Sequence, residues 1–155
     1  AFERVLRVNL NGTFLVTQAV AGEMLARGQG SIVNLSSIAA LGGIPTRNAY
    51  AAAKAGVLGM TRSMACEWAR RGIRVNAIAP GYVRTDLIEE LERRGAIDIA
   101  TLESRTPMGR LAELEEVAEA IAFLASPKAS FITGSVLVAD GGWSALGAPE
   151  ASLQD

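Results

Sequence analysis

The sequence predicts an α/β fold in which about three parallel strands form a doubly wound sheet flanked by helices. Three short runs, residues 31–36, 73–78 and 135–139, are rich in apolar residues and lack the strict polar alternation of a one-sided sheet. Such strands are typical of parallel sheets that helices cover on both faces. Helix-forming segments separate the runs in the order α-β-α-β-α-α-β, which favours this architecture.

Two long helices frame the first strand. Residues 1–27 carry apolar side chains near helical spacing, and Gly28 follows as a helix stop. The glycines and proline of residues 37–45 predict a loop after the strand. Residues 48–71 are rich in alanine, a strong helix former, and we expect this second helix to end at Gly72.

The remaining helices are shorter. Residues 86–105 show helical patches that are broken near Gly95 and again at Pro107. Residues 114–125 form a clear amphipathic pattern. Beyond the third strand we expect a C-terminal tail over residues 144–155, poorly ordered by its last residues.

The composition excludes several classes of protein. The 155 residues are 50% hydrophobic, so the chain can fill a core and is not a disordered segment. A net charge of −1 gives no strong attraction to nucleic acid or to anionic membranes, and we expect neither as a partner. The absence of histidine excludes a Ser-His-Asp triad and His-based zinc sites, and we expect no metal. The single cysteine, Cys66, fits a reducing compartment, so we expect a cytoplasmic location.

Tyr50 and Lys54 are the first candidate catalytic residues. They are four positions apart on a predicted helix and therefore share a face. A cation held near a phenol favours its phenolate, which can exchange a proton with an alcohol or carbonyl oxygen. The alternative is that the spacing arises by chance.

Ser37 and Asn9 are the next candidates. Ser37 follows the first strand, at the edge where open α/β sheets bind their ligands. Its hydroxyl can orient a substrate oxygen, or it can simply bond its own loop backbone. Asn9 lies inside an apolar helix, where its amide competes with the backbone. It marks either a backbone distortion that holds a water molecule or a packing accident.

The segment after the second strand also lies at a strand end. Pro80 is rigid, Gly81 permits a close approach, and Thr85 offers a hydroxyl. The alternative is an ordinary turn into a helix that Thr85 or Asp86 caps.

Five segments, in order and with matching spacing, resemble the catalytic half of the short-chain dehydrogenase/reductase family. They are residues 9–12 (Asn-Leu-Asn-Gly), 32–37 (Ile-Val-Asn-Leu-Ser-Ser), 50–54 (Tyr-Ala-Ala-Ala-Lys), 74–81 (Arg-Val-Asn-Ala-Ile-Ala-Pro-Gly) and 133–142, which close with Asp-Gly-Gly. The resemblance implies that residues 1–143 are the C-terminal catalytic part of a single Rossmann-like domain.

The resemblance also implies roles in transferring hydride between NAD or NADP and a small secondary alcohol or ketone. Tyr50 would be the acid/base, Lys54 would favour its phenolate and bind the nicotinamide ribose, Ser37 would orient the substrate oxygen, and Asn9 would hold the water of a proton relay. The cofactor would contact Tyr50, Lys54, Pro80, Gly81, Val83 and Thr85. The substrate would contact Ser37, Ile44, Tyr50 and Leu87, and Ile88, Leu91 and Ile97 would border it. Residues 86–105 would act as a mobile lid. The helices of residues 1–27 and 48–71 resemble subunit-interface helices, so we expect a homodimer or homotetramer.

The sequence departs from the family in one respect. None of the patterns G-x-G-x-x-G, T-G-x-x-x-G-x-G and G-x-x-x-x-G-K-S/T occurs, and the residue that selects NAD over NADP is missing. We therefore expect isolated residues 1–155 to bind dinucleotide weakly and to show little turnover, and the first strand to expose an apolar edge.

Three alternatives remain at this point. Lys54 could form a Schiff base with a carbonyl substrate. The chain could be a truncated, inactive fragment that acts only through subunit association. Five arginines could serve an anionic substrate group, although we favour a surface role for them. They are Arg84, Arg93, Arg94, Arg105 and Arg110.

Overall fold

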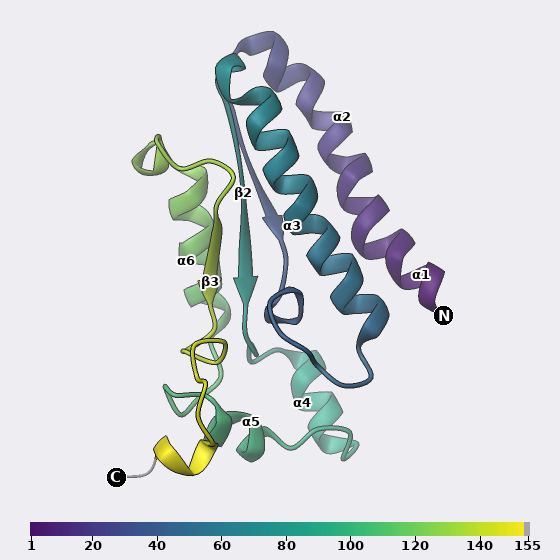
Figure 1. The fold of residues 1–155 in the computed structure, drawn as a ribbon, viewed down its shortest axis with the longest axis vertical. Coiled ribbons are helices and arrows are strands. Elements are labelled where there is room, and N and C mark those ends of the chain that lie inside the picture. The colour runs from purple at the N-terminus through teal and green to yellow at the C-terminus, as the bar shows by residue number, and fades with distance from the viewer. Residues whose placement is uncertain (154–155) are drawn as a thin grey trace.

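The computed structural model describes residues 1–153 (Figure 1). The expectation that the tail is poorly ordered by its last residues falls partly on residues 154–155, outside the described part. The elements, in chain order, are α1 (Phe2–Leu6), the π-helical turn η1 (Arg7–Asn11), α2 (Gly12–Arg27), β1 (Gly30–Leu35), the 3₁₀ turn η2 (Ile38–Ala40), α3 (Asn48–Trp68), η3 (Ala69–Arg71), β2 (Ile73–Pro80), α4 (Asp86–Arg93), α5 (Ile99–Arg105), α6 (Leu114–Ala125), η4 (Pro127–Ala129), β3 (Val136–Ala139) and η5 (Glu150–Leu153).

The three strands form a parallel sheet in the order β1-β2-β3, which confirms the predicted fold class. Gly30 pairs with Ile73 at one end of β1, and Leu35 pairs with Ile78 at the other. Because all three strands run the same way, their carboxyl ends meet at one edge of the sheet (Figure 1). Ligands of open α/β sheets bind at that edge.

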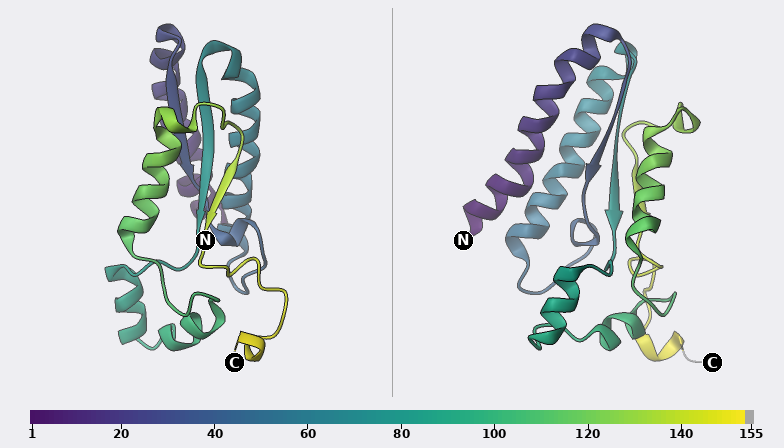
Figure 2. Two further views of the ribbon diagram at one scale, coloured as in Figure 1. Left: turned by 90° about the vertical axis from the view of Figure 1, so that its left-hand side faces the viewer. Right: turned by 180° about the vertical axis from the view of Figure 1, so that it is seen from behind.

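Helices cover both faces of the sheet. The segment from α1 to α2 packs beside α3 on one face, and α6 lies against the other (Figure 2). A core cluster between α3 and the sheet contains Ile32, Met64, Ala65, Ile73 and Val75. The central strand β2 is buried at Ile73 and from Val75 to Ala79, as expected for a parallel strand between two helical layers.

The helix predicted over residues 1–27 is continuous, but it contains the π-helical turn η1. A π turn accommodates one extra residue and distorts the helix locally. Gly28 and Gly72 end their helices in the left-handed conformation, with φ of 67° and 80°. A Cβ at Gly72 would lie 2.0 Å from the carbonyl oxygen of Gly28, so only glycine fits where the two helix ends meet.

Several boundaries differ from the prediction by one to three residues. α3 ends at Trp68 and continues as the 3₁₀ turn η3. β2 runs two residues beyond the predicted end at residue 78, because Pro80 is its last residue and pairs with Ala139. The next residue, Gly81, donates its N–H to the carbonyl of Ala139, so the missing N–H of proline does not interrupt the pairing.

The region of residues 86–105 consists of two short helices, α4 and α5, separated at Gly95 as predicted. Both lie beyond the carboxyl ends of the strands, below the sheet in Figure 1. In residues 1–153 we find no helix with the length and apolar character needed to cross a membrane.

Candidate active site

A cleft of about 600 Å³ opens at the carboxyl edge of the sheet. Its walls come from the ends of β1 and β2, the start of α3, the π turn and α4. The predicted residues that line it are Asn9, Ser37, Ile44, Tyr50, Pro80, Gly81, Val83, Thr85, Leu87, Ile88, Leu91 and Ile97. The structure therefore brings together every predicted site residue except Lys54 in one cavity.

Tyr50 and Lys54 lie on the same face of α3. Tyr50 is half-buried in the first turn of the helix. Lys54 is only 7% exposed, and its Nζ lies 5.5 Å from the centre of the Tyr50 ring. The Nζ donates a hydrogen bond of 2.9 Å to the carbonyl of Leu35, at the end of β1.

Burial lowers the pKa of Lys54 from its usual 10.5, because desolvation disfavours the charged ammonium. Lys54 is not among the residues that line the cleft, and its Nζ already donates to the carbonyl of Leu35. The geometry therefore gives no support to a Schiff base.

The two serines after β1 have different environments. Ser36 is buried, and its hydroxyl donates to the backbone carbonyl of Lys54 at 3.0 Å. Ser37 lines the cleft, and its Oγ accepts the N–H of Ala39 at 3.2 Å. The predicted loop bond of Ser37 thus exists, and because Oγ is the acceptor, its own proton is left to donate into the cleft.

Asn9 lies in the π turn, so the predicted backbone distortion is present. Its side-chain Nδ2 donates to the backbone carbonyl of Val5 at 3.1 Å, and the backbone carbonyl of Asn9 accepts the hydroxyl of Thr13 at 2.9 Å. The first of these bonds holds the side-chain amide, and Asn9 lines the cleft. π turns occur frequently at functional sites.

Gly81 and Thr85 combine structural roles with their place in the cleft. A Cβ at Gly81 would lie 2.9 Å from Cα of Asp140, so the close approach that requires glycine is that of the chain after β3. Thr85 is the N-cap of α4, and its Oγ1 accepts the N–H of Ile88 at 3.3 Å, as the alternative interpretation expected.

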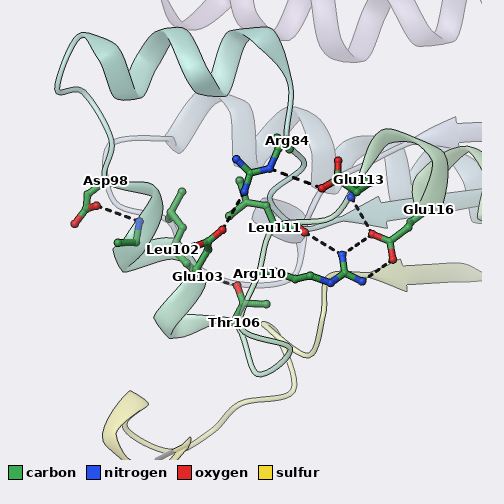
Figure 3. Close-up of polar contacts among 10 residues, drawn as sticks. Arg84, Asp98, Leu102, Glu103, Thr106, Arg110, Leu111, Glu113 and Glu116 are labelled. Atoms are coloured by element: carbon green, nitrogen blue, oxygen red, sulfur yellow. Dashed lines mark hydrogen bonds and ion pairs between the residues drawn. The ribbon is translucent and has the colours of Figure 1, made fainter.

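Ion pairs join the segment after β2 to α5 and to the residue before α6, and the segment before α6 to α6 itself (Figure 3). Arg84 contacts Glu103 at 3.0 Å and Glu113 at 3.8 Å. Arg110 donates two hydrogen bonds of 2.7 Å to the carboxylate of Glu116, and the N–H of Glu113 donates a third. These hydrogen bonds lower the pKa of Glu116 to about 2.

The five arginines considered above all have partners within the protein. Arg93 and Arg94 pair with Glu90, and Arg84 and Arg110 form the pairs just described. Arg105 lies 4.8 Å from the Trp143 ring, which also packs edge-on against Tyr82 at 5.0 Å. The favoured surface or structural role therefore agrees with the geometry.

Six residues that line the cleft are missing from the sequence prediction: Val5, Leu35, Ser36, Ile38, Arg47 and Tyr82. Arg47 precedes Tyr50 by three positions at the start of the same helix, a spacing that could have signalled its proximity. Tyr82 follows the Pro80-Gly81 turn, which the prediction did include.

A largely apolar cleft with a few polar side chains, at the carboxyl edge of a parallel α/β sheet, defines a ligand-binding protein of the doubly wound class. A family model described as enoyl-(acyl carrier protein) reductase matches residues 1–144. The sequence is 49% identical over 153 residues to an uncharacterized short-chain type dehydrogenase/reductase of Sinorhizobium fredii, covering 99% of this chain and 28% of that protein. It is 48% identical over 141 residues to 3-oxoacyl-(acyl-carrier-protein) reductase of Thermotoga maritima, covering 91% of this chain and 56% of that protein.

A solved structure of a dehydrogenase is similar to this chain in both fold and sequence. The crystal structure of a gluconate 5-dehydrogenase from Burkholderia cenocepacia in complex with NADP and tartrate has a TM-score of 0.88 and 41% identity, covering 94% of this chain and 56% of that one. The chain belongs to the short-chain dehydrogenase/reductase family, which confirms the resemblance. It spans about half the length of the Thermotoga and Burkholderia proteins.

Proposed function

We propose that residues 1–143 are the catalytic part of a Rossmann-like domain in an NAD(P)-dependent oxidoreductase that interconverts a secondary alcohol and a ketone. The observation that carries this proposal is the placement of the Tyr50 phenol in the cleft with the buried Nζ of Lys54 5.5 Å from its ring. In this proposal, a protonated Lys54 stabilises the negative charge that develops on the Tyr50 oxygen during proton transfer.

In the proposed mechanism, Tyr50 holds or releases a proton at its phenolic oxygen. When an alcohol is oxidised, the phenolate accepts the hydroxyl proton, and when a ketone is reduced, the phenol donates it. Ser37 donates a hydrogen bond from its hydroxyl to the same substrate oxygen. Its Oγ already accepts the N–H of Ala39, which leaves the O–H free to donate. Asn9 holds a water molecule that passes protons between Lys54 and solvent.

The residues at this edge of the sheet fit the nicotinamide end of NAD or NADP. The cleft is lined by Pro80, Gly81, Val83 and Thr85, together with Tyr50 and the end of β1. We propose that these residues and Lys54 hold the nicotinamide and its ribose. When bound, the cofactor supplies the two-electron redox chemistry. The NADP in the Burkholderia structure supports this cofactor class.

We also propose a homodimer or homotetramer assembled through residues 1–27 and 48–71. Large apolar side chains are exposed along the first of these segments, and burial against a second copy would remove them from water. They are Phe2, Val8, Phe14, Leu15, Val16 and Val20. The cytoplasmic location stays a prediction.

The test uses the natural protein that carries this sequence. The purified protein is mixed with NAD or NADP and a panel of secondary alcohols, and absorbance of the reduced nicotinamide is followed. We expect turnover that Tyr50→Phe lowers by about 10²- to 10⁴-fold, the usual contribution of a general acid/base, with an unchanged circular dichroism spectrum. Tyr82→Phe removes the other phenol of the cleft and should cause a much smaller loss. Equal losses in the two variants would refute the assignment of Tyr50.

A further inference from the structure

Arg47 contributes the only charged side chain among the residues that line the cleft. The other residues of the wall are apolar or carry neutral hydroxyl and amide groups. No carboxylate lines the cleft to neutralise the guanidinium. An isolated positive charge beside the proposed acid/base gives the site a preference for one kind of substrate.

The guanidinium of Arg47 has no ion-pair partner within residues 1–153. The arginines around the lid, in contrast, are held by Glu90, Glu103, Glu113 and Glu116. Arg74 is likewise occupied, since its guanidinium donates to backbone carbonyls at the end of α6. Arg47 is therefore the arginine at the cleft with its hydrogen-bond donors available to a ligand.

The backbone fixes the position of Arg47 at the mouth of the cleft. Its N–H donates to the carbonyl of Ile44 at 3.2 Å, and its carbonyl accepts the N–H of Ala51 at 2.8 Å. Thr46, directly before it, has a φ of 68°, which is strained for a β-branched residue. Strain of this kind persists where the surrounding structure fixes the chain, and it accumulates at ligand sites.

We propose that Arg47 binds a carboxylate of the substrate, so that the site acts on hydroxy acids or oxo acids with an apolar chain. A guanidinium offers parallel N–H donors that match the two oxygens of a carboxylate. Arg47 supplies one positive charge, which a monoanionic carboxylate balances and a phosphate dianion does not. The apolar wall formed by Ile44, Leu87 and Ile88 would hold the carbon chain. This inference rests on the proposed alcohol–ketone chemistry for its reacting group, but the anion site can be tested by binding alone.

The binding test uses matched probes on the natural protein. Hexanoate and hexanamide have the same chain length and differ in charge, and hexyl phosphate tests the dianion. We expect calorimetry to show that hexanoate binds about tenfold or more tightly than hexanamide, the ratio expected from one charge-assisted pair. Arg47→Gln should abolish this preference, and Arg47→Lys should restore part of it. Lys128→Gln removes the same charge at an exposed position outside the cleft and should preserve it.

The kinetic test compares 3-hydroxyhexanoate with its methyl ester. We expect Arg47→Gln to raise KM for the acid by about 10- to 100-fold, with kcat nearly unchanged and the ester unaffected. Equal effects on acid and ester would overturn the proposal, as would equal binding of hexanoate and hexanamide, no hexanoate binding, or tighter binding of hexyl phosphate. If the wild-type protein oxidises neither compound nor any neutral alcohol, the proposed function fails, while the calorimetric comparison still decides the role of Arg47.

Discussion

The ammonium group of Lys54 lies 5.5 Å from the centre of the Tyr50 ring. The same ammonium donates to the carbonyl of Leu35, and the Lys54 carbonyl accepts the hydroxyl of Ser36. Two hydrogen bonds thus tie this turn of α3 to the end of β1. The distance between the phenol and the sheet edge is set by the fold and does not depend on a flexible side chain at the surface.

Replacing Lys54 by methionine should change how stability depends on pH. Because burial lowers the pKa of Lys54, the folded state binds fewer protons than the unfolded state between that lowered pKa and 10.5. The free energy of unfolding of the wild type should therefore rise with pH across this window relative to Lys54→Met. Urea unfolding at several pH values measures it. Lys128→Met, at an exposed position, should run parallel to the wild type, and parallel curves for Lys54→Met would contradict the prediction.

Replacing Glu116 by glutamine should alter stability in acid. The hydrogen bonds from Arg110 lower the pKa of Glu116 from 4.5 to about 2, so its ionised form stabilises the folded state. This contribution is present above pH 4.5 and is lost as the pH falls toward about 2. The gap in unfolding free energy between wild type and Glu116→Gln should shrink over that range. Glu119→Gln on the same helix is the control, and a gap that stays constant down to pH 2 would be the contrary result.

Replacing Asn9 by alanine should affect both stability and activity. The variant loses the hydrogen bond from Nδ2 to the carbonyl of Val5, which we expect to cost about 1 kcal/mol of unfolding free energy. If Asn9 supports a proton relay, kcat should also fall. Asn11→Ala, an exposed residue of the same π turn, provides the comparison. A kcat for Asn9→Ala equal to that of Asn11→Ala would argue against the relay.

Replacing Arg84 by glutamine should loosen the lid at one end. The contact with Glu103 joins the exit of β2 to α5, in the region that the resemblance predicts to be a lid, and partly exposed pairs of this kind contribute about 0–1 kcal/mol. Global stability should hardly change, while amide hydrogen exchange in α5 should become several-fold faster. Arg93→Gln breaks a pair within α4 and should leave exchange in α5 unchanged. If the amide exchange rates of α5 are the same in both variants, Arg84 does not restrain that helix.

The local pattern of apolar, glycine and alanine residues predicted most of the helices and strands. Glycines end both long helices where expected, because the left-handed conformations at Gly28 and Gly72 are a property of that residue. The position of Pro80 was harder to predict, because whether a proline ends a strand depends on which backbone groups the neighbouring strand offers. The close approach of Asp140 to Gly81 could not be predicted either, because the two residues are far apart in the sequence.

The candidate site was predicted from residue types whose spacing carries chemical meaning. Tyr50 and Lys54 share a helix face through local geometry alone. Arg47 lies three positions before Tyr50, but this spacing alone does not single it out, because an arginine at a helix start is usually a solvated surface residue. Arg47 can serve as an anion site only because no carboxylate lines the cleft. The lining depends on how segments that are distant in the sequence assemble.

The contacts of Trp143 give the protein an intrinsic fluorophore at the base of its lid. The indole touches Arg105 at the end of α5 and Tyr82 just after β2, so movement of either changes its surroundings. The sequence holds only two tryptophans, and the other, Trp68, ends α3 at the amino-terminal side of the sheet. With Trp68 changed to phenylalanine, the emission spectrum would report whether residues 86–105 move as the predicted lid when a ligand is added, without any attached dye.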